Sequence, residues 1–253
     1  MHSIMIVSTG VILPALALIL GVFLSAYLVK QWVGHPTERR PRFFLFWAAA
    51  LFLMYWFQIP MILANLGRAI RVKDFNLFFA LTLPIAFLAL VFLYIGLVDI
   101  LEIRLKSSTK FLLTGYFLAA VIFFAYHFIA RGGIIETYSL PLIGNLVFYL
   151  PIRLLIIFVL AKWLMGRPTA PNLDSILGAA GIMGESVLGI IRNILIIKNV
   201  LAYPPEFWYV VLVNLRIFFI LQIASLFLLI LGIFFLHREY CRRQSAVMVE
   251  EWQ

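Results

Sequence analysis

Apolar residues fill most of the chain in long unbroken runs, and short polar segments separate one run from the next. Each run holds about 20 residues or more, which is enough for an α-helix to cross a hydrocarbon core of roughly 30 Å. The segments between them are too short to fold as a soluble domain. The pattern therefore predicts an all-α integral membrane protein, a seven-transmembrane-helix bundle forming a single domain over residues 1–253. The predicted spans are residues 4–33, 43–66, 75–103, 111–130, 142–165, 173–197 and 207–236.

Composition supports a membrane protein. Hydrophobic residues make up 64% of the chain and charged residues only 12%, whereas soluble domains contain about 25% charged residues. Mean hydropathy is +1.07. The first run exceeds the 7–15 residues of a signal-peptide core and no Lys or Arg precedes it, so we interpret it as a transmembrane helix of the mature protein. The single cysteine, Cys241, excludes an internal disulfide.

Basic residues fall unequally on the two ends of the predicted helices, which predicts the orientation of the chain. Twelve Lys and Arg side chains lie on one side: Lys30, Arg39, Arg40, Arg42, Arg104, Lys106, Lys110, Lys162, Arg167, Arg238, Arg242 and Arg243. The other side holds five: Arg68, Arg71, Lys73, Arg131 and Lys198. We expect the richer side to be cytoplasmic, with the N-terminus outside and the C-terminus inside. The net charge of +9 is then a topology signal, and no nucleic-acid partner is expected.

An internal repeat offers a hypothesis about the organisation of the bundle. A shift of 132 residues aligns identical residues at the ends of the first and fifth spans: Leu28 with Leu160, Lys30 with Lys162, Gly34 with Gly166, Pro36 with Pro168 and Thr37 with Thr169. The repeats would be residues 4–104 and 142–236, two parallel halves joined by a linker helix at 111–130. The alternative is that apolar sequences match by chance and that Gly and Pro end many helices.

Three charged residues occur at similar depths within the last three predicted spans. Counted from the outer ends at 1.5 Å per residue, Arg153 and Arg216 lie roughly 18 Å deep and Glu185 roughly 20 Å deep. Arg192 would lie about 9 Å from the outer boundary. Because a charge near the bilayer centre costs about 2.5–3.5 kcal/mol on insertion scales, we expect these side chains to face the bundle interior.

Small residues accompany the charges of the sixth span. Gly178, Gly181 and Gly189 lie on or beside the face that carries Glu185. Such residues let neighbouring helix backbones approach closely, so this helix is predicted to be interior.

Two interpretations of the charged residues remain open. Glu185 could neutralise one arginine and lock three helices together, or the cationic surplus could bind a small anionic or amphiphilic ligand. The candidate ligand-binding residues are Arg153, Glu185, Arg192, Asn214 and Arg216. Their expected polar neighbours are Asn145, Tyr149 and Gln222.

Motifs for catalysis and cofactors are absent from the sequence. It contains no HExxH or GxSxG motif and no lysine in the seventh span that could hold retinal. We expect no cofactor, no metal, and a function other than catalysis.

The sequence favours a multi-pass carrier or binding protein in a prokaryotic cytoplasmic membrane. The alternative is a membrane-embedded sensor that signals through a cytoplasmic partner. The lipid bilayer is the expected surrounding in both cases, and a homo-oligomer is compatible with either.

Overall fold

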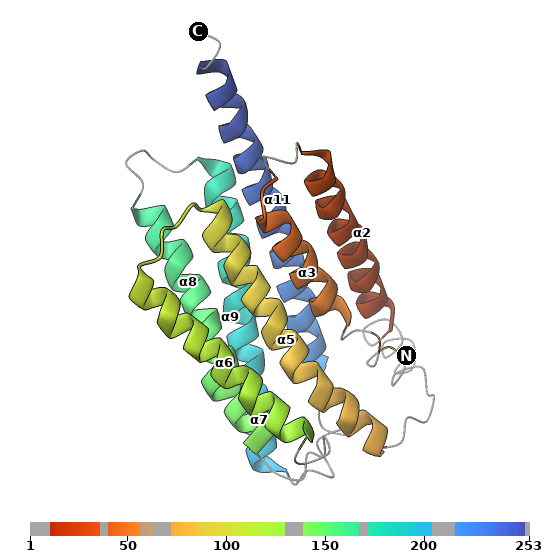
Figure 1. Ribbon diagram of the computed structural model, residues 1–253. Helices are drawn as coiled ribbons and strands as arrows, with labels where there is room; N and C mark the ends of the chain where they lie inside the picture. The colour runs from red at the N-terminus through yellow and green to blue at the C-terminus, as the bar shows by residue number, and fades with distance from the viewer. Residues whose placement is uncertain are drawn as a thin grey trace.

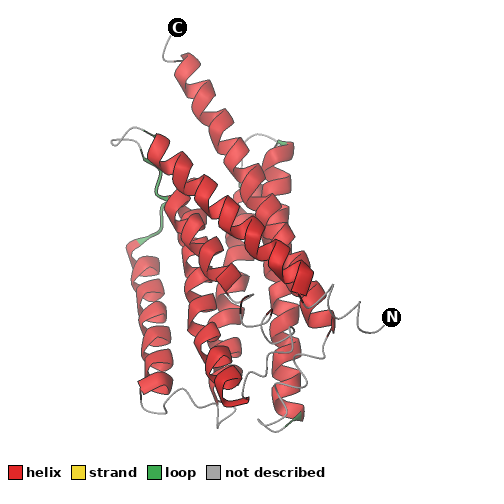
Figure 2. Cartoon of the chain, turned by 90° about the vertical axis from the view of Figure 1, so that its right-hand side faces the viewer, coloured by secondary structure: helices red, strands yellow, loops and turns green. Residues whose placement is uncertain are grey.

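The computed structural model describes residues 11–35, 40–56, 59, 62, 72–129, 139–166, 172–203 and 216–250. Every regular element in these residues is a helix (Figure 2). In chain order the elements are α2 (Leu13–Gly34), α3 (Phe43–Trp56), α5 (Val72–Ile100), α6 (Ser107–Ile129), α7 (Ser139–Ile143), the π-helix η3 (Gly144–Tyr149), α8 (Leu150–Met165), α9 (Leu173–Ala202) and α11 (Arg216–Glu250).

Six stretches of these helices are long and apolar enough to cross a membrane, and α3 is a shorter apolar helix. The described helices fit the seven predicted spans in number and order. The chain is therefore a multi-pass helical membrane protein. The second half of the predicted second span, and residues 207–215 of the predicted seventh, lie outside the described helices.

Six of the described helices form a ring of packing contacts. Around it, α2 packs on α3, α3 on α5, α5 on α8, α8 on α9, α9 on α11, and α11 returns to α2. The order α2, α3, α5 matches the order α8, α9, α11, as the predicted repeat requires. The repeat itself stays a prediction.

Helix α6 lies outside this ring and contacts it through aromatic side chains. The ring centroid of Phe87 on α5 is 6.2 Å from that of Phe117 and 6.0 Å from that of Phe124, both on α6. The Tyr116 hydroxyl donates to the carbonyl oxygen of Phe148 at 2.5 Å. Helix α6 thus covers one side of the bundle and exposes most of its own apolar surface.

Helices α9 and α11 share the most extensive interface, and glycines bring their backbones together. A Cβ atom added to Gly181 would lie 2.7 Å from the Cα atom of Gly232, and one added to Gly232 would lie 3.0 Å from the carbonyl oxygen of Gly178. Side chains at these positions would force the helices apart. Gly178 and Gly181 therefore act as the sequence predicts.

Helix α3 is fixed to α5 and α2 by polar contacts. The Asp99 carboxylate accepts the backbone N–H of Phe43 at 2.8 Å, which caps the first turn of α3 from another helix. The Ser25 hydroxyl donates to the Ala48 carbonyl oxygen at 2.8 Å. The indole ring of Trp47 occupies the space beside Gly96, where a side chain would overlap it.

The fifth predicted span differs from a plain α-helix because it begins with the π-helix η3. Pro151 has no N–H to donate to the Val147 carbonyl four residues earlier. The Tyr116 hydroxyl, which donates chiefly to Phe148, also lies 3.2 Å from that carbonyl oxygen, and the Leu150 N–H reaches back five residues to the Asn145 carbonyl oxygen. The wider turn accommodates the missing backbone hydrogen bond.

The last helix extends beyond the boundary predicted at residue 236 and continues to Glu250. Both views show its final turns projecting past the rest of the bundle (Figures 1 and 2). Arg238 pairs with Asp174 of α9 at 3.1 Å, and the buried Glu239 accepts a hydrogen bond from the Asn172 side chain at 2.5 Å. These contacts hold a polar segment in the helical conformation where the hydrophobic pattern ends.

Candidate functional site

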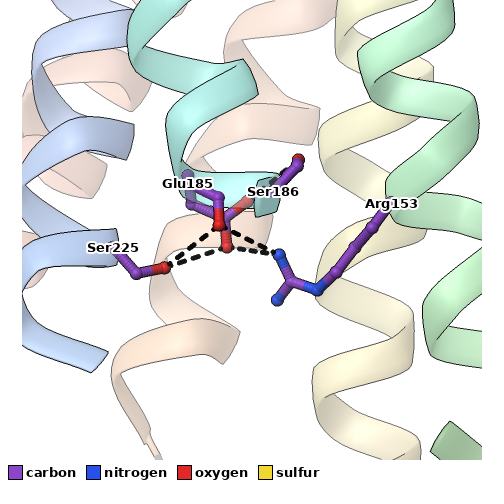
Figure 3. A network of polar contacts seen from close by, with 4 residues as sticks. All are labelled: Arg153, Glu185, Ser186 and Ser225. Carbon is purple, nitrogen blue, oxygen red and sulfur yellow. Dashed lines mark hydrogen bonds and ion pairs between the residues drawn. The ribbon is translucent and has the colours of Figure 1, made fainter. Parts of the chain in front are cut away.

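An ion pair between α8 and α9 lies inside the bundle. Arg153 Nη1 is 2.7 Å from Glu185 Oε1, and the side chains are only 3% and 2% exposed. Figure 3 shows the guanidinium reaching across from α8 toward the carboxylate on α9. The two charges predicted at similar depth therefore meet. Because both are removed from solvent and lipid, each depends on the other for charge compensation.

Two serine hydroxyls complete the surroundings of the carboxylate (Figure 3). Ser186 Oγ donates to Glu185 Oε2 at 3.2 Å, and Ser225 Oγ from α11 donates to Oε1 at 3.3 Å. Both serines are fully buried. Sequence reasoning missed them, although a serine next to Glu185 and another in the apolar seventh span are the available signals. The contacts join α8, α9 and α11 at one point.

Gly189 provides the space for the guanidinium. A Cβ atom added there would lie 2.5 Å from Arg153 Nε and would overlap Cζ and Nη1. The sequence grouped Gly189 with the glycines that allow backbones to approach each other. In the structure a side chain fills its empty volume, so Gly189 belongs to the charged site.

Two buried nitrogen donors at this site have no hydrogen-bond acceptor in the described part of the chain. They are Arg153 Nε and Asn193 Nδ2. Asn193 is 5% exposed and follows Gly189 by one helical turn, so it lies on the same side of α9. An unsatisfied buried donor costs about 1–3 kcal/mol, so each of these two groups favours an additional hydrogen-bond acceptor.

Arg192 lies on the same turn of α9 as Asn193 and is partly buried. It stands two turns, or roughly 10 Å, from Glu185 along the helix. Arg153 and Arg192 together carry one positive charge more than Glu185 carries negative charge.

The remaining predicted ligand-binding residues are not placed beside the ion pair. Asn214 lies outside the described residues. Arg216 is the first residue of α11, and only its backbone is described. That these two residues share the site with Arg153 and Glu185 remains a prediction.

Two expected polar neighbours already have partners of their own. The Asn145 side chain donates to the Pro141 carbonyl oxygen at 2.5 Å, and the Tyr149 hydroxyl donates to the Leu83 carbonyl oxygen on α5. Gln222 is buried on α11. The Tyr149 contact thus ties η3 to α5, and the Asn145 contact lies within the same span.

Comparison with known proteins gives no family assignment. No protein-family model, no curated protein and no solved structure matches this chain. The candidate function therefore rests on the geometry of the site. Within the described ranges, no group of three or more His, Cys, Asp or Glu side chains is arranged to hold a metal ion. What the site offers is the two hydrogen-bond donors of Arg153 and Asn193 that have no acceptor among the described residues.

Proposed function

We propose that this protein binds a small anionic or amphiphilic solute between α8 and α9 and carries it across the membrane. The observation that supports the proposal is the buried arginine with an unused donor: Arg153 satisfies Glu185 through Nη1, while its Nε has no acceptor. A structural ion pair alone would not require this donor to stay unsatisfied. An anion would supply the acceptor.

The proposed route to the site passes Arg192. On the orientation predicted from the basic residues, Arg192 lies nearer the outer surface than Arg153 does. A partly buried arginine at that level would attract an anion before it reaches the ion pair. In a carrier, the site must then become accessible from the cytoplasmic side, and repeated halves around a central site are one architecture that permits it.

Thermal melting in detergent tests the binding step. Chloride, nitrate and benzoate, supplied at constant ionic strength, are compared on the wild type, Arg192→Gln and Lys198→Gln. Lys198 is exposed on the same helix, so its substitution removes the same charge away from the site. A ligand at 100 times its Kd stabilises the folded protein by about 2.7 kcal/mol.

We expect at least one of these anions to raise the melting temperature of the wild type and of Lys198→Gln in a saturable manner. Arg192→Gln should show a smaller rise. If all three proteins melt identically in every salt, the anion site is refuted and the ion pair has only a structural role.

A sensor is the second candidate, and the long final helix favours it. Helix α11 carries Ser225 against Glu185 and continues, through contacts with Asp174 and Asn172 of α9, to a segment beyond the bundle. A ligand that moved the Glu185 carboxylate would therefore act on the helix that reaches the predicted cytoplasm. Anion flux in proteoliposomes supports the carrier, whereas ligand-dependent movement of this segment without flux supports the sensor.

A further inference from the structure

We propose that the end of the bundle predicted to face the cytoplasm carries a second binding site, which takes a small zwitterion. The site is a cavity of about 330 Å³ lined by residues 40–43, Asp99, Glu102 and Tyr240. Pockets that bind small ligands measure about 300–1,000 Å³. The cavity includes no residue of the Arg153–Glu185 pair, so this inference is independent of the function proposed above.

Three helices build the cavity. At the start of α3, the Asp99 carboxylate of α5 accepts the Phe43 N–H at 2.8 Å through Oδ2. The turn that ends α5 contributes Glu102, and α11 contributes Tyr240. The rings of Phe43 and Tyr240 pack with their centroids 4.9 Å apart, and Phe43 is only 1% exposed. The cavity therefore has an aromatic wall, whereas its two carboxylates are exposed.

The turn at Glu102 has a backbone conformation that is unfavourable for this residue type. The Ile103 N–H donates to the Val98 carbonyl oxygen at 3.0 Å, and the Glu102 N–H donates to that of Asp99 at the same distance. This is the Schellman pattern of a helix C-terminus, and it places Glu102 in the left-handed region with a φ of 53°. Glycine is the usual residue there, because a Cβ atom is disfavoured. A glutamate at such a position points to a role for its carboxylate in the cavity.

Charges of both signs line the cavity without pairing with each other. In the described ranges, no ion pair joins Arg40 or Arg42 to Asp99 or Glu102. Arg40 donates to the His35 carbonyl oxygen at 3.0 Å, whereas Arg42 is exposed. Opposite charges that share a cavity and stay apart are complementary to a ligand that carries both.

The ligand would use its two charged groups separately. Its carboxylate or phosphate would lie against Arg42, and its ammonium group would lie against Glu102 and the second oxygen of Asp99. A ligand with one charge would leave half of these groups without a partner. Free amino acids and the phosphoethanolamine headgroup of lipids share the required chemistry.

Calorimetric titration of the full-length, detergent-solubilised protein tests the site. The zwitterionic probes are glycine, β-alanine and 4-aminobutanoate, whose charges are progressively farther apart, and glycerophosphoethanolamine, which represents the lipid headgroup. Acetate and ethylammonium carry one charge each. At least one zwitterion should bind about tenfold more tightly than either singly charged probe, the expected gain from one more hydrogen bond to a charged group. The tightest probe distinguishes a free amino acid from a lipid headgroup.

Three glutamine variants test the assigned residues. Arg42→Gln and Glu102→Gln should each weaken binding of the tightest zwitterion by about tenfold. Arg104→Gln is the control, because Arg104 is exposed two residues after Glu102 and does not line the cavity. It should bind this zwitterion as the wild type does.

Glu102→Gly separates a binding role from a structural one. Glycine removes the carboxylate and relieves the left-handed backbone, so this variant should melt at a higher temperature than the wild type. It should also bind the zwitterion as weakly as Glu102→Gln does. If Glu102→Gly melts at a lower temperature and binds normally, the carboxylate has a structural role and the proposal is overturned. The proposal also fails if no zwitterion binds, or if acetate or ethylammonium binds equally tightly.

Discussion

Replacing Gly189 with alanine is the most direct perturbation of the ion pair, because it changes neither charge. The added Cβ would lie 2.5 Å from Arg153 Nε, whereas nonbonded atoms of this kind prefer about 3.5 Å or more. The guanidinium must therefore withdraw by about 1 Å or more, since the backbone of α9 cannot yield. Its contact with Glu185, now 2.7 Å, would then become too long for a good hydrogen bond.

The expected loss of stability follows from two opposing effects. Separating a buried ion pair costs about 3–5 kcal/mol when one partner is left uncompensated. Alanine is a better helix former than glycine by about 1 kcal/mol, which offsets part of this cost. Gly189→Ala should therefore destabilise the protein by about 2–4 kcal/mol.

Equilibrium unfolding in mixed micelles, followed by circular dichroism, measures this loss. Gly115→Ala on α6 is the matched control, because an added Cβ there meets nothing within 4 Å. That variant should be as stable as the wild type or slightly more stable. In an Arg153→Ala background, Gly189→Ala should no longer be destabilising, because the group it displaces is gone. An equal cost in both backgrounds would refute the clash with the guanidinium.

Three further predictions concern the same bundle. Glu185→Ala should destabilise the protein by about 3–5 kcal/mol in the same unfolding assay, because it leaves Arg153 buried without its counter-charge; an unchanged midpoint would contradict the role of the pair. Gly96→Ala should cost about 1–3 kcal/mol by displacing the Trp47 indole, and a normal tryptophan emission spectrum and midpoint would argue against that packing. The exposed Cys241 should react with a membrane-impermeant maleimide only after cells are opened, and labelling of intact cells would overturn the predicted orientation.

The sequence predicts the number and order of the helices because the thickness of the bilayer sets the length of apolar sequence that each span needs. The structure departs from the prediction where contacts with other helices determine the local conformation. The hydrophobic pattern cannot show that the Tyr116 hydroxyl lies against the Val147 and Phe148 carbonyl oxygens, so the π-helix was not predicted. It also cannot show that Asp174 and Asn172 stabilise the polar turns after residue 236.

The sequence predicts the charged site only to the extent that the depth of each residue in the membrane shows which charges lie at one level. Counting residues from the helix ends places Arg153 and Glu185 at one level, and the cost of exposing them to lipid turns them inward. Their contact with Ser225 depends on how α9 and α11 are rotated about their axes, which counting does not give. The role of Gly189 likewise depends on which side chain of α8 packs against it.

The six helix–helix interfaces that close the ring differ in extent, which determines where the bundle deforms most easily. Among the described residues, the interfaces between α2 and α11 and between α5 and α8 are the smallest, and they lie on opposite sides of the ring. Helices α2, α3 and α5 then form one three-helix unit and α8, α9 and α11 form the other, and the two units also meet where Phe43 of α3 contacts Tyr240 of α11 at a ring-centroid distance of 4.9 Å. The Arg153–Glu185 pair and Ser225 lie wholly within one unit. A deformation at the two small interfaces would therefore leave the contacts of this pair unbroken.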